Sequence, residues 1–183
     1  MEFDDVVNKR RSLRSFTPLE VSDSLIKDLA TVAGLAPSCS NKQPWRFVFV
    51  RSPGMLERML ATLAPGNVTW AKQSSLIIAV WSKADLDCKT PDGREYFQFD
   101  TGIASAFLML AAAARNLEAH AVAGFDPQAA RQVLALPADA QVITLIIMGG
   151  HSQQVSPGLT DWQVKAETER PPRLPFEELA TIA

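Results

Sequence analysis

The pattern of apolar and polar positions predicts a chain that alternates between helices and buried strands. In 22–35, apolar residues recur at helical spacing behind Ser22, a suitable N-cap, and Pro37 ends this segment. Further helices are predicted at about 3–10, 53–63, 94–117 and 127–134. Strands are predicted at four short apolar runs, 46–51, 76–81, 120–125 and 142–148. The tail from His151 is polar and rich in proline. With 183 residues, this pattern indicates a single α/β or α+β domain.

The predicted helix at 94–117 has an unusual surface, because 103–114 is apolar on every side. Such a helix must be buried all round, and a domain of this size has little room for a fully wrapped helix. One face could pack on a second copy of the chain, since symmetric dimers are the commonest oligomers. The alternative is a two-sided core within one chain. The run contains Ser105 and is too short to span a bilayer, so no membrane partner is expected.

Composition and charge narrow the functional classes. The formal net charge of −2 disfavours general nucleic-acid binding, which needs a basic face against phosphates. The two cysteines, Cys39 and Cys88, lie far apart and outside any metal-ligand spacing, which argues against a disulfide scaffold and a structural zinc site. The two histidines, His120 and His151, also lack ligand spacing, so no metal site is expected. Three acids precede the first basic residue, which fits neither a secretory signal nor a transit peptide and predicts a cytoplasmic location.

A basic cluster, Lys9-Arg10-Arg11-Ser12-Leu13-Arg14, stands where the first helix is expected to end. Guanidinium groups match phosphate oxygens and a serine adds a neutral donor, so the cluster could hold a phosphate monoester. The alternative is a solvated basic helix end, where cations also favour the helix dipole. Arg170 and Arg173 add cations near the C-terminus, although composition alone indicates a disordered tail there.

The loop 36–45 offers backbone amides, serine hydroxyls and the Asn41 amide, which suit a polar heteroaromatic ligand. The alternative is an ordinary loop with Trp45 in the core. Cys39 is expected to be a small buried thiol rather than a nucleophile, because no Cys-His-Asn or Cys-x-x-Cys arrangement accompanies it.

The predicted strand at 120–125 ends in Gly124-Phe-Asp126. Glycine permits close approach of a ligand to the backbone, while Asp126 is expected to cap the helix that begins at Pro127. His120, on the same apolar strand, is expected to be a hydrogen-bonded core residue rather than a general base.

The order and spacing of these segments resemble the nitroreductase family over nearly the whole chain. The resemblance is carried by Arg10-Arg-Ser-Leu-Arg-Ser-Phe16, Ala36-Pro-Ser-Cys-Ser-Asn-Lys-Gln-Pro-Trp45, Asp100-Thr-Gly102, Ala123-Gly-Phe-Asp126, Ile146-Ile-Met-Gly149 and Arg173-Leu-Pro175. The first two segments are the most specific.

The resemblance implies an α+β fold in which helices flank a mixed central β-sheet, with residues 1–183 forming one FMN-binding domain. It also implies an intertwined homodimer that holds FMN at the subunit interface. The flavin phosphate would be bound by Arg10, Ser12, Arg14 and Arg173, with Arg11 nearby. Pro37, Ser38, Cys39 and Asn41 would reach the flavin from the partner subunit. The backbone of Val122, Ala123 and Gly124 would face the reactive edge of the ring.

The implied activity is that of an FMN-dependent NAD(P)H oxidoreductase. In a ping-pong reaction, NAD(P)H would pass a hydride to the flavin and leave, and a small electron-poor acceptor such as a nitroaromatic or a quinone would then be reduced. No side chain is assigned as a general acid or base. Two positions depart from the family: Ala123 replaces an acidic residue of many larger members, and Pro171 replaces a lysine of some members.

Three alternatives remain open at this point. One is a flavin-binding, flavin-sensing or flavin-consuming protein on the same scaffold without reductase activity. Another is a reductive dehalogenase or ene reductase. The last is a cofactor-free dimerisation domain.

Overall fold

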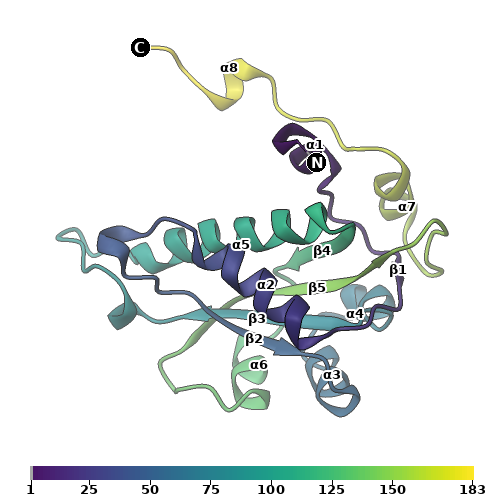
Figure 1. Ribbon diagram of the computed structural model, residues 1–183, viewed down its shortest axis with the longest axis horizontal. Helices are drawn as coiled ribbons and strands as arrows, with labels where there is room; N and C mark the ends of the chain where they lie inside the picture. Colours follow the sequence, from purple (N-terminus) through teal and green to yellow (C-terminus); the bar gives the residue numbers. More distant parts are fainter. Residues whose placement is uncertain (1) are drawn as a thin grey trace.

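A five-stranded sheet forms the centre of the computed structural model, which describes residues 2–183 (Figure 1). Its strands are β1 (Phe16–Thr17), β2 (Arg46–Val50), β3 (Leu76–Ser82), β4 (Leu117–Val122) and β5 (Gln141–His151). The long β5 pairs with β3 along one edge and with β4 along the other, and its last residues also pair with β1. β2 completes the sheet beside β3.

Helices cover both faces of this sheet. They are α1 (Phe3–Lys9), α2 (Asp23–Gly34), α3 (Pro53–Leu60), α4 (Pro65–Ala71), α5 (Tyr96–Ala114), α6 (Pro127–Val133), α7 (Asp161–Thr168) and α8 (Phe176–Leu179), with short 3₁₀ turns η1 (Cys39–Asn41) and η2 (Ala84–Leu86). Figure 1 shows α2 and α5 on one face and α3, α4 and α6 on the other. The α+β class with a central sheet flanked by helices, predicted from the sequence, is confirmed.

The central strands carry continuous apolar runs because both of their faces are buried. Side chains alternate along β3 and β5, so Ile77 and Ile147 pack toward α3, α4 and α6, whereas Ile78 and Ile146 pack toward α2 and α5. All four of these isoleucines are fully buried.

The pairing within the sheet differs from the expectation of a mixed sheet. All four strand pairings among residues 2–183 are antiparallel, including the extensive β3–β5 and β4–β5 ladders. The helical and strand patterns in the sequence do not encode strand direction, so the antiparallel pairing could not be predicted from them.

Most predicted elements are confirmed, and four of them, α3, α5, β4 and β5, have at least one end shifted by three residues. The Ser22 hydroxyl accepts the Leu25 N–H at the start of α2, and Asp126 caps α6 as expected. The predicted strand at 120–125 in fact covers Leu117–Val122, because the chain turns at Asn116, whose φ of 60° is left-handed. α5 consequently ends at Ala114 instead of extending to 117.

Three helices were not predicted. α4 follows closely on α3 at Pro65, and α7 and the short α8 lie inside the polar, proline-rich tail. α7 does carry a recognisable signal, since Thr160 and Gln163 form a capping box.

α5 lies on the sheet beside α2 and is only half covered by its own chain. Residues such as Ala104 and Leu108 are fully buried, whereas Phe99 is 59% exposed and Gly102 and Ala106 are also exposed. By length and composition α5 could cross a membrane, but half of its apolar window is buried in the protein, as in a core helix. Its second apolar face is therefore left open in one protomer.

Candidate cofactor-binding site

A cavity of about 150 Å³ lies where the segment after α1 meets α7 and the C-terminal segment. It is lined by Arg10, Arg11, Ser12, Arg14, Trp162, Ala166, Arg170, Pro171 and Arg173. The structure thus brings together the whole predicted phosphate set, from opposite ends of the sequence. The sequence analysis did not identify Trp162 or Ala166, which belong to the unpredicted helix α7. This set of residues is called the arginine cavity below.

The segment between α1 and β1 is held in place through its backbone. Both carboxylate oxygens of Glu167 accept hydrogen bonds, from the N–H of Arg14 at 2.9 Å and from the N–H of Ser15 at 3.1 Å. On the other side, Nδ1 of His120 lies 3.0 Å from the carbonyl oxygen of Leu13. α7 and β4 therefore fix the backbone that presents Ser12 and Arg14 to the cavity.

Arg14 is the most deeply buried of the cavity arginines, with only 9% of its surface exposed. Its guanidinium carbon lies 4.8 Å from the centre of the Trp162 ring and 5.9 Å from that of Trp70. Burial lowers the pKa of Arg14, and its buried Nε has no hydrogen-bond partner among the described residues. A buried cation with a free donor calls for an anionic partner.

Arg10, Arg170 and Arg173 place three further positive charges around the same space. The pKa of Arg10 is lowered by burial and then by the charges of Arg170 and Arg173. No carboxylate is among the described residues that line the cavity. An uncompensated cluster of this kind, with a hydroxyl beside it, is suited to a phosphate.

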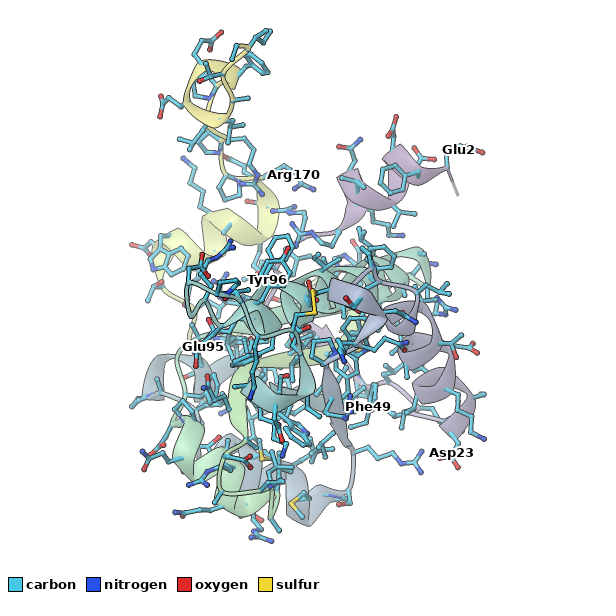
Figure 2. The ribbon with its side chains drawn as sticks, turned by 90° about the vertical axis from the view of Figure 1, so that its left-hand side faces the viewer. Glu2, Asp23, Phe49, Glu95, Tyr96 and Arg170 are labelled. Atoms are coloured by element: carbon cyan, nitrogen blue, oxygen red, sulfur yellow. A yellow bond between two sulfur atoms is a disulfide. The ribbon has the colours of Figure 1, made fainter. Side chains whose placement is uncertain are left out.

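The C-terminal arginines are ordered against the N-terminal segment. Arg170 donates hydrogen bonds to the carbonyl oxygens of Asn8 and Arg10, and Figure 2 shows it where the chain leaves α7. The indication of a disordered tail is therefore wrong for this stretch, because the tail's cations satisfy carbonyls at the end of α1. Arg11 donates to the carbonyl oxygens of Ala166 and Glu169, so its role is to join the two segments.

The loop at 37–41 lies at a different place, beside the start of α5. Ser40 and Asn41 adopt left-handed backbone angles, with φ of 47° and 55°, and Asn41 is exposed. The hydroxyl of Ser38 accepts the N–H of Gln43 at 2.9 Å, which closes the turn. Among residues 2–183 of one chain, the lining of the arginine cavity does not include Pro37, Ser38, Cys39 or Asn41.

The expectation for the cysteines is wrong. Cys39 and Cys88 form a disulfide with a Cα–Cα distance of 6.1 Å, so Cys39 is not a buried free thiol. The two cysteines are 49 positions apart, and the fold of the intervening chain brings them together, which spacing along the sequence could not reveal. A carboxylate oxygen of Asp87 and the two sulfurs lie within 4.8 Å of one another, but the sulfurs are bonded to each other in this structure.

The strand end at 122–124 is shaped by packing against α4. The Gly124 carbonyl accepts hydrogen bonds from the N–H of Ala64 at 2.9 Å and from Nδ2 of Asn67 at 3.0 Å. A Cβ at position 124 would lie 2.7 Å from Nδ2 of Asn67, so glycine is needed for this contact. Val122 is buried and Ala123 is exposed, which leaves Ala123 as the accessible part of the predicted flavin-facing backbone.

His120 is a core residue, as predicted. It is 7% exposed, stacks on Trp70 with ring centres 4.8 Å apart, and has its pKa lowered to about 4 by burial. Because a carbonyl oxygen only accepts, Nδ1 of His120 carries the proton that is donated to Leu13.

Comparison with known proteins identifies the class of this fold and site. The model of the nitroreductase family matches residues 7–78 and 62–151, so the chain belongs to this family. The predicted enzyme class, a flavin oxidoreductase of the nitroreductase type, is thereby confirmed.

Individual relatives of this chain are named for different activities. The chain is 29% identical over 168 residues to 5,6-dimethylbenzimidazole synthase of Rhodobacter capsulatus, covering 79% of this chain and 81% of the relative. It is 25% identical over 179 residues to an NADH dehydrogenase of Thermus thermophilus, covering 81% and 86%. A solved oxidoreductase containing FMN superposes with a TM-score of 0.79 at 26% identity, covering 99% of this chain and 91% of the other.

Proposed function

We propose that this protein binds FMN with the flavin phosphate in the arginine cavity and uses NAD(P)H to reduce nitroaromatic, quinone or similar electron-poor acceptors. The observation that carries the proposal is the cavity itself, in which buried Arg14 has a free Nε and no lining residue is a carboxylate among those described. The solved relative that contains FMN supports the choice of cofactor.

The residues fit a phosphate monoester, which carries about two negative charges at neutral pH. Arg10, Arg14 and Arg173 would supply charge-assisted hydrogen bonds, and Ser12 a neutral one. The phosphate would offset the charge of the buried Arg14 and relieve the repulsion among Arg10, Arg170 and Arg173. Arg170 thus joins the predicted set, although its hydrogen bonds to Asn8 and Arg10 limit it to an electrostatic contribution.

Two features support a homodimer with the cofactor at the interface. One is the open apolar face of α5, which includes Phe99. The other is the C-terminal arm, residues 174–183, which extends away from the body of the protein (Figure 1). The arm exposes Leu174, Phe176, Leu179 and Ile182, and its backbone hydrogen bonds, from Glu178, Leu179 and Ala180, all run within the arm. An apolar arm of this kind is stable only against a second surface.

In such a dimer, the loop at 37–41 of one subunit would meet the arginine cavity and the 122–124 strand end of the other. This division would explain why the loop and the cavity are separate in one protomer. Pro37, Ser38, Cys39 and Asn41 would then orient the ring from one side, and the exposed backbone at Ala123 would face it from the other.

When bound, FMN supplies the hydride-accepting and hydride-donating chemistry of its ring. The chain's own residues bind and orient it. His120 is neutral and committed to Leu13, so it is unsuited to proton transfer at the site. The nicotinamide and the acceptor would occupy the same face of the ring in turn.

A second candidate is a flavin-binding protein that does not act as a reductase. It is favoured by one observation, the similarity to a relative named as a synthase. The two candidates differ in one property: a reductase would lose its flavin absorbance on addition of NAD(P)H in the absence of oxygen, and the alternative would not.

The phosphate assignment is tested by FMN and riboflavin titrations of the wild type and of the double variant Arg10→Ala/Arg14→Ala. We expect the double variant to bind FMN at least about 100-fold more weakly, since two charge-assisted hydrogen bonds are lost. Its affinity for riboflavin, which has no phosphate, should change little. The matched control is Arg58→Ala, which removes an exposed arginine on α3. An unchanged FMN affinity in the double variant would show that the phosphate binds elsewhere.

A further inference from the structure

The two cysteines of the chain join two segments next to the start of α5. Cys39 lies in the loop at 37–41, and Cys88 lies in the irregular segment between η2 and α5. Figure 2, in which this end of the molecule faces the viewer, shows the bond between the two sulfurs in yellow. Both residues are partly exposed.

Two buried acids surround this bond. The Asp100 carboxylate accepts the N–H of Cys39 at 2.7 Å, and Oδ1 of Asp87 accepts the N–H of Cys88 at 2.7 Å. A carboxylate oxygen of Asp87 lies within 4.8 Å of both sulfurs. Asp87 is only 7% exposed, and its Oδ2 is buried without a hydrogen-bond partner among the described residues.

The protonation of Asp87 indicates a role for its buried Oδ2 in the chemistry of the disulfide. Burial raises the pKa of Asp87, the Cys88 N–H lowers it, and the charge of Asp100 and a side-chain hydrogen bond with it raise it again, so that Asp87 holds a proton more readily than an exposed aspartate. In the oxidised protein its polar partners are the Cys88 N–H and the Asp100 carboxylate. A disulfide offers no donor, whereas a thiol can donate an S–H, so reduction of the bond would add a donor within reach of the buried Oδ2.

We propose that Cys39–Cys88 is a reversible redox centre that exchanges with small dithiols, with the carboxyl of Asp87 as the proton donor to the thiolate that is released. The chain would thereby accept electrons at a second site, made of its own sulfurs. The proposal does not depend on the assignment of the flavin phosphate.

The exchange begins when one thiolate of the dithiol attacks Sγ of Cys88, which lies in the segment with exposed neighbours such as Lys89. The bond between the protein sulfurs breaks, and Cys39 leaves as a thiolate that takes the proton from Asp87. The second thiolate of the reductant then attacks the reductant sulfur bonded to Cys88, which releases Cys88. Two electrons pass from the reductant sulfurs to the protein sulfurs, the reductant becomes a cyclic disulfide, and water returns a proton to Asp87 and supplies one to Cys88.

Opening the bond would also free the 84–95 segment from the loop at 37–41. Several of its polar contacts are local, such as Thr90 with Arg94 at 3.0 Å and Arg94 with Asp92 at 2.6 Å, while Glu95 at its end accepts a hydrogen bond from Gln141 of β5 at 3.3 Å. Lys89 and Arg94 are exposed, so trypsin should cleave after them once the segment is released.

The test uses the native full-length protein, treated with dithiothreitol, alkylated with N-ethylmaleimide and analysed by intact mass. We expect two adducts after reduction, none without reductant, and faster trypsin cleavage after Lys89 and Arg94 in the reduced sample. Cyclic oxidised dithiothreitol should restore the starting mass pattern. Alkylation that requires denaturant would overturn the proposal, because the bond would then be a structural crosslink that dithiols do not reach in the folded protein.

Two variants test the role of the acid. Asp87→Asn should lower the rate of reduction about tenfold or more at fixed pH, because the amide cannot give up a proton to the leaving thiolate. The control Asp92→Asn removes an exposed acid of the same segment and should leave the rate unchanged. A wild-type rate in Asp87→Asn would remove Asp87 from the mechanism. Because the readouts are mass and cleavage, either result is independent of FMN binding.

Discussion

The guanidinium of Arg14 lies against the face of Trp162, with its central carbon 4.8 Å from the ring centre. The two residues come from opposite ends of the chain, and Trp162 is 62% exposed although it covers a buried cation. This contact keeps Arg14 in place at the lining of the cavity.

Removing the ring should weaken phosphate binding without touching a phosphate ligand. Trp162→Ala is expected to raise the Kd for FMN about 3- to 30-fold, from the loss of a cation–π contact of about 0.5–2 kcal/mol. Trp162→Phe, which retains an aromatic face, should recover most of the affinity. Equal FMN affinities in all three proteins, measured by fluorescence titration, would show that the contact with Trp162 does not hold Arg14 in the conformation that binds the phosphate.

Glu167 is expected to be a positioning residue for the same segment. Its two oxygens accept the N–H groups of Arg14 and Ser15, and Gln can replace only one of these acceptors. Glu167→Gln should therefore lower the free energy of unfolding by about 1–3 kcal/mol. FMN affinity should fall in parallel, whereas the exposed neighbour variant Glu169→Gln should change neither quantity measurably. Chemical denaturation and FMN titration of both variants test this.

The buried His120 gives stability a defined pH dependence. Its pKa is about 4 in the folded protein and about 6.5 in the unfolded chain, so the unfolded state binds more protons between these values. The His120 contribution is constant above about pH 6.5 and is lost as pH falls toward 4. The loss is on the order of 3 kcal/mol, from a shift of about 2.5 pH units at 1.36 kcal/mol each.

Urea denaturation at a series of pH values checks this expectation against His120→Asn. The amide can donate a hydrogen bond but does not titrate, so the stability of the variant should depend less on pH in this range. Curves of equal slope for the two proteins would mean that His120 is not the group responsible.

The open face of α5 and the C-terminal arm should govern dimer formation. Phe99→Asp places a charge on the exposed apolar face of α5, and removal of residues 174–183 deletes the arm. Sedimentation should detect a dimer for the wild type and a shift toward monomer for each variant, with weaker FMN binding in parallel. The control Gln128→Asp adds a charge at an exposed position of α6, which lies on the opposite face of the sheet from α5. A wild-type protein that sediments as a monomer would contradict the dimer.

The sequence predicted the central fold well, for a clear physical reason. β3 and β5 are apolar runs buried on both faces, and α2 is bounded by a serine cap and a proline, so local pattern and tertiary structure agree. The ends of β4 were misplaced because Asn116 adopts a left-handed turn, which no apolar pattern marks.

The candidate site was only partly accessible from the sequence. The arginine and serine positions were identified, but Trp162 and Glu167 were missed because no helix was predicted in the polar, proline-rich tail that contains α7. The Thr160–Gln163 capping box is the signal that could have revealed it. The Cys39–Cys88 bond depends on how distant segments meet, and for that reason spacing arguments gave the wrong expectation.

The most direct test of the central claim is an anaerobic absorbance spectrum of the purified protein, recorded before and after addition of NADPH and then of NADH. The account predicts flavin bands at about one FMN per subunit, which bleach when one of the two nucleotides is added and return when a quinone or nitroaromatic acceptor follows. Stable bands that neither nucleotide bleaches would contradict the reductase function. A colourless protein that also fails to bind added FMN would contradict the cofactor site itself.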